Sequence, residues 1–213
     1  MIPLHDDVPT RTTPVVTIAL IVACTLVFLW QQTLSEREQV AIVYQLGVIP
    51  VVLFHKAELP EDLRLVAGEW TVLTSMFLHG GWLHLIGNML YLWIFGNNVE
   101  DAMGHPRYLV FYLACGAAAA LFQSWQDPLS ETPMIGASGA IAGVLGAYLL
   151  LHPRARVLVL VPLGFFSQVL RVPAFIVLGL WFLMQFLLGA ATPTRQGGVA
   201  KGAQGGGVVA GVG

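Results

Sequence analysis

The 213-residue chain is 56% hydrophobic, only 10% charged, and carries a formal net charge of −2, whereas a soluble domain contains about 25% charged residues. Its mean hydropathy of +0.75 excludes an ordinary water-soluble domain, and the near-neutral charge gives no indication of a nucleic-acid partner. Both cysteines, Cys24 and Cys115, lie within apolar runs. We therefore expect them to be small buried residues, not a disulfide or a metal site.

Six segments are candidates for membrane-spanning helices, each of which needs about 20 predominantly apolar residues. They cover residues 14–31, 82–99, 108–125, 137–152, 173–190 and 197–213. The first is too long for the apolar core of a signal peptide and no small-residue cleavage site follows it, so we expect it to be retained. The last consists almost wholly of Gly, Ala and Val, and barely crosses a bilayer. The predicted fold is therefore an all-α, polytopic membrane bundle of six transmembrane helices that forms a single domain over residues 1–213.

Two connecting stretches are expected to stay outside the bilayer core. Residues 33–69 form a long outer loop with two short apolar patches, 40–44 and 48–54, which are too short to cross. We expect these patches to lie in the interface or to fold back on the bundle. Residues 157–170 are apolar but short and contain Pro162 and Gly164. An interfacial segment is predicted there instead of a crossing.

The positions of Lys and Arg favour a cytoplasmic N-terminus. In that orientation the inner segments hold Arg11, Arg107, Arg154, Arg156 and Arg171, and the outer loops hold Arg37, Lys56, Arg64 and Arg195. The inner residues lie in short segments close to span ends, where the positive-inside rule has most force. Because the sequence shows no transit peptide and no soluble extension, a bacterial plasma (inner) membrane is the expected location.

Polar side chains within a membrane span are costly, so they are either structural or functional. His84 and Asn88 are four residues apart in the second predicted span, and on a helix they share one face. Both can donate hydrogen bonds to a developing oxyanion. The alternative is an interhelical hydrogen bond that only holds helices together. His79, at the head of the same helix, is expected to order the preceding loop.

A serine lies where a polar loop changes into a Gly/Ala-rich helix. This residue, Ser138, stands in the sequence Gly-Ala-Ser-Gly that begins at Gly136. An ordinary helix N-cap would explain the serine as well as a nucleophile would. Gly139 and Gly143 follow it on one helical face, and such a face lets another helix approach closely.

The final predicted span offers a matching face. Gly207 and Gly211 are four residues apart, and Gln204 lies one turn before Gly207 on roughly the same side. If this face packs against the face of Gly139 and Gly143, then Gln204 meets Ser138. We therefore expect the fourth and sixth spans to be in direct contact near the serine.

Taken together, these motifs resemble the rhomboid family of intramembrane serine proteases, over nearly the whole chain from residue 14 to 213. The resemblance rests on three motifs that occur in the expected order and in the expected spans. They are the His-x4-His-x3-Asn cluster of His79, His84 and Asn88, the Gly-x-Ser-Gly motif from Gly136 to Gly139, and Ala203, Gly207 and Gly211, which match the Ala-His-x-x-Gly-x-x-x-Gly pattern of the last rhomboid span.

The resemblance implies a Ser–His dyad that hydrolyses peptide bonds in or near transmembrane segments. Ser138 would be the nucleophile, and His84, Asn88 and the Ser138 backbone N–H would hold the oxyanion. The implied partners are transmembrane protein substrates or clients and the lipid bilayer, with no nucleic acid, no metal and no other cofactor. The loop at residues 192–196 would belong to the gate between the fifth and sixth spans.

One position departs from the family pattern, because Gln204 occupies the place of the base histidine. A serine hydroxyl is a weak nucleophile until an adjacent base accepts its proton, and a carboxamide does not accept protons near neutral pH. Removing the base from a Ser–His system costs several powers of ten in rate. Rhomboids usually carry apolar or aromatic residues where this chain has Lys201 and Gly202.

Three explanations for Gln204 stay open at this point. The chain is a catalytically inactive rhomboid-like pseudoprotease that binds transmembrane clients, or its C-terminal residues are altered, or Lys201 acts as the base from roughly the same helical face. The alternative for Lys201 is a side chain that snorkels to the interface. A transporter or channel is disfavoured, because the spans hold few ionisable groups and no visible inverted repeat.

Overall fold

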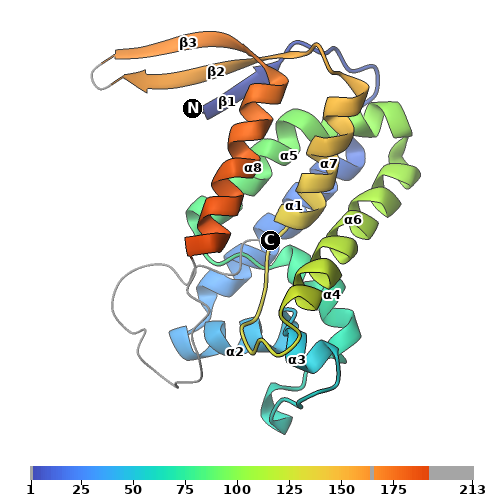
Figure 1. Cartoon of the computed structure of the whole chain (residues 1–213), viewed down its shortest axis with the longest axis vertical. Helices are drawn as coiled ribbons and strands as arrows, with labels where there is room; N and C mark the ends of the chain where they lie inside the picture. The colour runs from blue at the N-terminus through green and yellow to red at the C-terminus, as the bar shows by residue number, and fades with distance from the viewer. Residues whose placement is uncertain (1, 164–165, 192–213) are drawn as a thin grey trace.

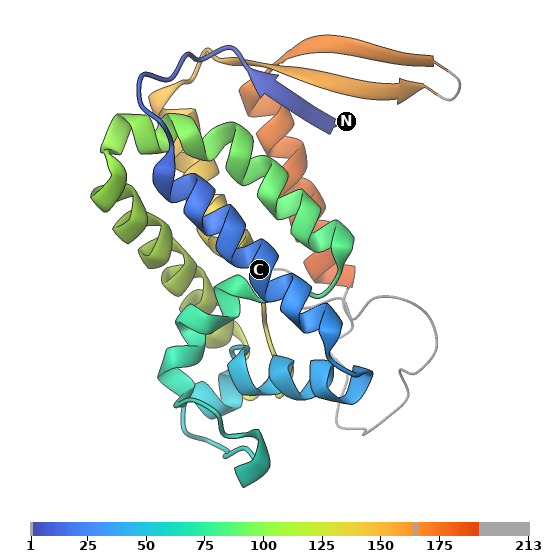
Figure 2. The same ribbon diagram turned by 180° about the vertical axis from the view of Figure 1, so that it is seen from behind.

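The computed structural model describes residues 2–163 and 166–191 and is mostly helical (Figures 1 and 2). Its longer elements are β1 (Ile2–Asp6), α1 (Val15–Thr33), α2 (Glu36–Leu46), α5 (Trp82–Met103), α6 (His105–Gln126), α7 (Ser138–Leu151), β2 (Arg156–Leu163), β3 (Phe166–Pro173) and α8 (Ala174–Ala191). Short helices α3 (Pro50–Leu53) and α4 (Thr71–Thr74) and the 3-10 turns Glu61–Leu63, Gly68–Trp70 and Ser75–Phe77 lie between α2 and α5.

Helices α1, α5, α6, α7 and α8 occupy the places of the first five predicted spans. Of these, α1 and α6 are long and apolar enough to cross a membrane, while α7 and the stretch Ala174–Met184 are apolar but shorter. Helix α5 continues past the predicted end at residue 99, because the polar residues that follow are bound by the start of α1, as shown below. The predicted span at 197–213 lies outside the described residues.

A small antiparallel sheet makes the all-α prediction wrong in one part. Its strand order is β1-β2-β3, and β2 pairs with β3 from Arg156↔Pro173 to Leu163↔Phe166. Residues 157–163 and 166–170, within the stretch predicted to be an interfacial segment, therefore belong to two paired β-strands. The alternating valines Val157, Val159 and Val161 favour a strand, and the first two of these are fully buried.

The sheet and the α2–α4 region lie at opposite ends of the helical bundle, and the β2–β3 hairpin projects sideways past α8 (Figures 1 and 2). Helix α7 packs against both α5 and α6. Large aromatic side chains fill the interior, and the rings of Phe95 and Tyr148 meet edge to face with centroids 4.9 Å apart. The short helix α7 is thus held centrally by its neighbours.

The long loop after α1 folds back on the bundle, one of its two predicted arrangements. The backbone of Val48 exchanges two hydrogen bonds with Met134, at 2.9 and 2.7 Å. Thr74 Oγ1 donates to the carbonyl oxygen of Leu46 at 2.7 Å. Helix α2 begins with a capping box between Ser35 and Glu38, which satisfies backbone donors at its start. These bonds place the loop against the segment that precedes α7.

Glu100, near the end of α5, joins three helices through one buried carboxylate. Its side chain accepts from the backbone N–H groups of Val16 and Thr17, at 2.8 Å each, and from Thr17 Oγ1 at 2.7 Å. It also contacts Nδ1 of His105, the first residue of α6. A carboxylate at the N-terminus of α1 satisfies donors that have no partner within the helix and interacts favourably with the helix dipole. Glu100 therefore fixes the start of α1 against α5 and α6.

We predict that Glu100→Ala lowers the free energy of unfolding by about 2–5 kcal/mol, because it leaves the buried N–H of Thr17 and the part-buried N–H of Val16 without an acceptor. The measurement is denaturant unfolding in detergent micelles. Glu61→Ala is the control, because Glu61 is exposed and its side chain makes no hydrogen bond or ion pair within the described chain. A loss for Glu100→Ala as small as that of the control would contradict the structural role.

A second buried carboxylate holds the sheet to α7. Asp6 Oδ2 accepts a hydrogen bond from the Tyr148 hydroxyl at 2.6 Å, and within the described residues Asp6 Oδ1 has no hydrogen-bond partner. Burial raises the pKa of Asp6 above its ordinary value of 3.8, and the hydrogen bond from Tyr148 offsets this only in part. The folded chain therefore holds this proton to a higher pH than the unfolded chain does.

We predict that stability falls as the pH rises from 3.8 through the raised pKa of Asp6, because the folded state must give up a proton that it binds more tightly. Asp6→Asn removes this part of the pH dependence, whereas Asp7→Asn, at an exposed neighbouring carboxylate, keeps it. The check is the denaturation midpoint of each variant across that pH range. An unchanged profile in Asp6→Asn would show that another group is responsible.

Candidate active site

Ser138 is the first residue of α7 and is 3% exposed. The N-cap position belongs to Ala137, whose side chain cannot cap, and no side-chain cap bond is formed. The structure thus does not use the serine as an ordinary N-cap. Since the first N–H groups of a helix lack partners within the helix, the backbone at Ser138 presents donors at this end of α7.

The loop that leads into α7 is held by backbone bonds on both sides. Met134 pairs with Val48, and the N–H of Gly136 donates to the carbonyl oxygen of Ser75 at 2.8 Å. Gly136 has φ = +122°, a conformation that side chains other than hydrogen rarely adopt. The loop conformation before Ser138 therefore requires glycine at this position.

Gly136 also lies directly against the polar pair on α5. A Cβ atom at Gly136 would be 2.7 Å from Cε1 and 2.8 Å from Nε2 of His84, and 3.9 Å from Nδ2 of Asn88. The structure thus brings together the two motifs that the sequence analysis identified in separate spans. His84 and Asn88 lie on one face of α5, as predicted, and that face meets the backbone two residues before Ser138.

The donors of this pair point at no acceptor within the described residues. The N–H of Gly80 donates to Nδ1 of His84 at 3.4 Å, so the ring proton resides on Nε2. His84 Nε2 and Asn88 Nδ2 are both buried and without a hydrogen-bond partner there. Each unsatisfied buried donor costs about 1–3 kcal/mol, so the pair calls for an explanation. Stabilisation of an oxyanion requires hydrogen-bond donors that are already fixed in place, and these two N–H groups have that arrangement.

His79 supports His84 from the preceding loop. Its backbone N–H donates to Gln31 Oε1 at 3.2 Å, and its ring lies edge-on to the ring of His84 with centroids 5.1 Å apart. Burial, together with the neighbouring His84, lowers the pKa of His79 to about 3, so its ring is neutral near pH 7. The predicted role in ordering the loop fits these contacts.

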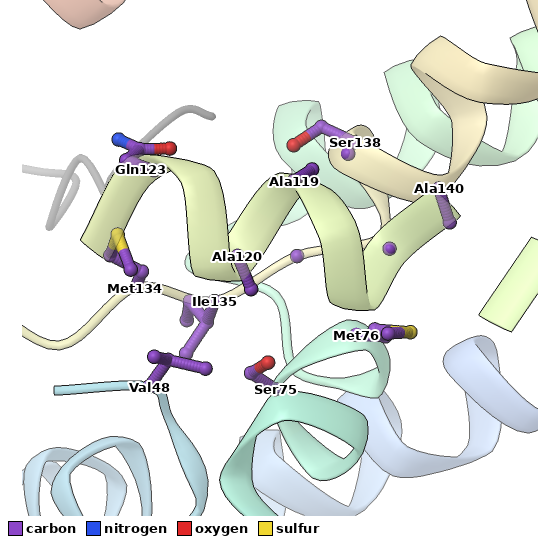
Figure 3. A pocket seen from close by; sticks show the side chains of 13 residues that line it. Val48, Ser75, Met76, Ala119, Ala120, Gln123, Met134, Ile135, Ser138 and Ala140 are labelled. Carbon is purple, nitrogen blue, oxygen red and sulfur yellow. The ribbon is translucent and has the colours of Figure 1, made fainter. Parts of the chain in front are cut away.

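A hollow of about 390 Å³, including space open to the outside, lies beside Ser138 between α6, α7 and the loop before α7 (Figure 3). Ser138 and Ala119 lie on one side of it, and Ser75 and Met76 lie on the other. Met76 packs directly against Gly116 of α6, because a Cβ atom there would lie 2.5 Å from Cε of Met76.

The small-residue face of α7 packs against α6. A Cβ atom at Gly139 would lie 2.6 Å from Cβ of Ala119, and one at Gly143 would collide with the side chain of Cys115. Both partners belong to α6. The expected contact of this face with Gly207 and Gly211 stays a prediction, because those two residues lie outside the described part of the chain.

The proton-transfer part of the predicted site lies outside the described residues. This applies to Lys201, Gly202, Ala203, Gln204, Gly207, Gly211 and the loop at 192–196. Their predicted roles stay predictions.

Sequence reasoning missed residues that shape the hollow, notably Ser75 and Gln123. Gln123 had a signal of its own, because it is a polar residue within a predicted span. Ser75 had none, since its carbonyl oxygen, and not its side chain, holds Gly136.

Comparison with known proteins adds the decisive observation. The family model for the rhomboid domain matches residues 67–213, which is more than half of the chain and includes every motif discussed above. The chain belongs to the rhomboid family. Rhomboids are membrane proteins, and the apolar helices α1 and α6 agree with that setting.

Curated relatives include several rhomboids. The chain is 33% identical over 135 residues to Rhomboid protein 1, mitochondrial, of Saccharomyces cerevisiae, covering 56% of this chain and 39% of that protein. It is 42% identical over 90 residues to Rhomboid protease GluP of Bacillus subtilis, covering 42% and 17%. For RHOMBOID-like protein 5 of Arabidopsis thaliana, identity is 39% over 90 residues, covering 41% and 29%. The chain thus matches less than half the length of each of these three rhomboids.

We predict that Gly136→Ala lowers the free energy of unfolding by about 1–3 kcal/mol, because it forces an alanine into a strained backbone conformation and displaces His84. Gly87→Ala, on the same helix as His84, is the control, since nothing lies within 4 Å of a Cβ atom there. The comparison is made by denaturant unfolding in micelles. Equal stability of the two variants would disprove the close contact.

Proposed function

We propose that this rhomboid is an intramembrane serine endopeptidase whose nucleophile is Ser138 and whose oxyanion donors are His84, Asn88 and the Ser138 backbone N–H. The observation that supports this most directly is the pair of buried donors, His84 Nε2 and Asn88 Nδ2, which have no hydrogen-bond partner among the described residues and pack against the backbone two residues before the buried serine. Transmembrane proteins are the proposed substrates.

The chemistry follows from these positions. Ser138 Oγ forms a bond to the carbonyl carbon of the scissile peptide, and the carbonyl π electrons move to the oxygen. The oxyanion then accepts hydrogen bonds from the donors on α5 and from the start of α7, which lowers the barrier because these donors need no reorganisation. Collapse of the intermediate breaks the C–N bond and releases a protonated amine, and water later hydrolyses the ester.

The proton of Ser138 Oγ must pass to a base and from there to the leaving amine. The family resemblance assigns that position to Gln204, and a carboxamide is not competent for this step near neutral pH. We therefore propose that hydrolysis by this chain is weak or absent as the sequence stands. Lys201 is the alternative base, one turn away on roughly the same helical face.

We further propose that the chain crosses the membrane six times with its N-terminus in the cytoplasm of a bacterium. The helices found at the first five predicted spans support this topology, with α1 and α6 the best candidates for crossing. The arginines assigned to the inner side all belong to the sheet end of the molecule, in or beside β1–β3 or at the start of α1 and α6 (Figure 1). Lys56, Arg37 and Arg64 belong to the opposite end.

The test is covalent labelling of Ser138 by a fluorophosphonate, which reports activation of the nucleophile without knowledge of the substrate. We expect slow labelling or none in the original chain, and an increase of several powers of ten in Gln204→His, because a base is restored. Ser138→Ala in the Gln204→His background should abolish labelling. Ser124→Ala, at a buried serine that donates to Ala120 within α6, should leave it unchanged.

Two results would change this assignment. Rapid labelling of the original chain that is lost in Lys201→Gln would identify the lysine as the base. Labelling of Gln204→His that survives Ser138→Ala would exclude Ser138 as the nucleophile. Cleavage of a labelled transmembrane peptide by the same variants connects reactivity with hydrolysis.

A second candidate function is client binding without cleavage, favoured by Gln204 at the base position. A pseudoprotease of this kind would retain transmembrane clients through the hollow and the oxyanion donors. Ser138→Ala would then leave client retention unchanged, whereas His84→Ala with Asn88→Ala would weaken it. Restored hydrolysis in Gln204→His would show that the rest of the site is competent for catalysis.

A further inference from the structure

The β2–β3 hairpin has a composition unlike that of a hairpin in water. Between Arg156 and Arg171 the chain contains no charged residue. The hairpin also leaves the bundle, since it projects sideways past α8 in both views (Figures 1 and 2). Strand β3 has no second strand partner among the described residues, and an apolar hairpin with such a free edge is prone to aggregate in water.

The strand register assigns each residue to one of two faces. Val157 and Val159 are fully buried and define the face toward the bundle. On the opposite face, Ile2, Leu160 and Val169 form one row across the three strands. The next row holds His5, Leu158 and Arg171, and Arg156 follows diagonally on the same face. This face is therefore apolar toward the tip of the hairpin and cationic at its base.

Aliphatic side chains are exposed on both faces at once. Val169 is 52% exposed and its neighbour Leu170 is 43% exposed, although successive strand residues point to opposite faces. On β1, Ile2 and Leu4 are 46% and 42% exposed. A protein docked on one face would cover only one of these sets, whereas a surrounding apolar medium covers both.

The arginines at the base are available to a ligand. Neither Arg156 nor Arg171 takes part in the ion pairs found among the described residues. The nearby carboxylate of Asp7 accepts from the backbone N–H of Arg156 at 2.8 Å, and Asp6 is bound to Tyr148. Two guanidinium groups, diagonal on one face, suit a phosphate group, which arginine binds through paired N–H donors.

We propose that the hairpin is immersed in the interfacial layer of the adjacent membrane leaflet and that Arg156 and Arg171 bind the phosphate of anionic phospholipids. The strands lie at the level of the headgroups, where water can bond the free edge of β3, and their apolar side chains reach the upper acyl chains, while the arginines at the base bind the headgroups. The lateral projection from one end of the helical bundle directs the hairpin along the membrane surface. This role fixes the tilt of α7 and α8, and it does not depend on proteolysis.

Immersion is tested with the full chain in nanodiscs of phosphatidylcholine and phosphatidylglycerol. Val169→Cys and Leu170→Cys are labelled in turn with a fluorophore that responds to polarity, and the unsubstituted chain serves as the blank for Cys24 and Cys115. We expect lipid-borne nitroxides to quench both labels and aqueous iodide to quench neither. Ala102→Cys, at an exposed position near the end of α5, should show the opposite pattern.

Lipid selectivity is tested by native mass spectrometry of the same particles. We expect phosphatidylglycerol to be retained over phosphatidylcholine, and Arg156→Gln with Arg171→Gln to reduce that enrichment by about tenfold. Arg11→Gln with Arg107→Gln, at two exposed arginines near the starts of α1 and α6, is the charge-matched control and should retain the enrichment. Replacement of both arginines by lysine should restore part of it.

Three results would overturn the proposal. Iodide quenching of both labels would place the hairpin in water. Protection of only one face, dependent on the number of chains per disc, would indicate a second copy of the chain. Equal retention of both lipids by the original chain would exclude the arginine pair as a site for anionic headgroups.

Discussion

The contact between the backbone of Gly136 and the imidazole of His84 is the constraint on which the candidate site depends. It connects α5 with the loop before α7, two segments that are separated along the chain by the whole of α6. The contact exists because Gly136 has no side chain and adopts a conformation that glycine tolerates. Through it, two side-chain donors and the start of α7 converge on one region.

The buried polar side chains at the two ends of the bundle differ in how many hydrogen-bond partners they have. At the sheet end, Glu100 is surrounded by donors, and Asp6 receives the hydroxyl of Tyr148. At the site end, His84 Nε2 and Asn88 Nδ2 have no partner within the described chain. A buried carboxylate without partners would cost far more than a neutral N–H donor. The fold can therefore hold neutral donors unpaired for a ligand, provided that the carboxylates elsewhere are satisfied.

Holding an oxyanion and activating a serine are separate tasks, and the proposed site assigns them to distant parts of the sequence. The donors lie on α5 and at the start of α7, where backbone bonds to Val48 and Ser75 fix the loop. The base position that the family resemblance implies falls on Gln204, far along the chain. The donors alone could still bind a carbonyl oxygen in a hydrophobic setting, so the two proposed functions, client binding and hydrolysis, would use the same residues.

The positions of the long apolar helices and the shared face of His84 and Asn88 were predictable from the sequence, because hydrophobic length and the four-residue helical spacing are local properties. The sequence analysis did not predict the β2–β3 strand pair. An uncharged apolar run that contains Pro162 and Gly164 argues against a transmembrane helix, but it does not indicate which other structure forms there. The sequence also did not identify α6 as a neighbour of the face of Gly139 and Gly143, because a row of small residues permits close approach by any helix. Tertiary packing places α6 against this face and brings Gly136 against His84.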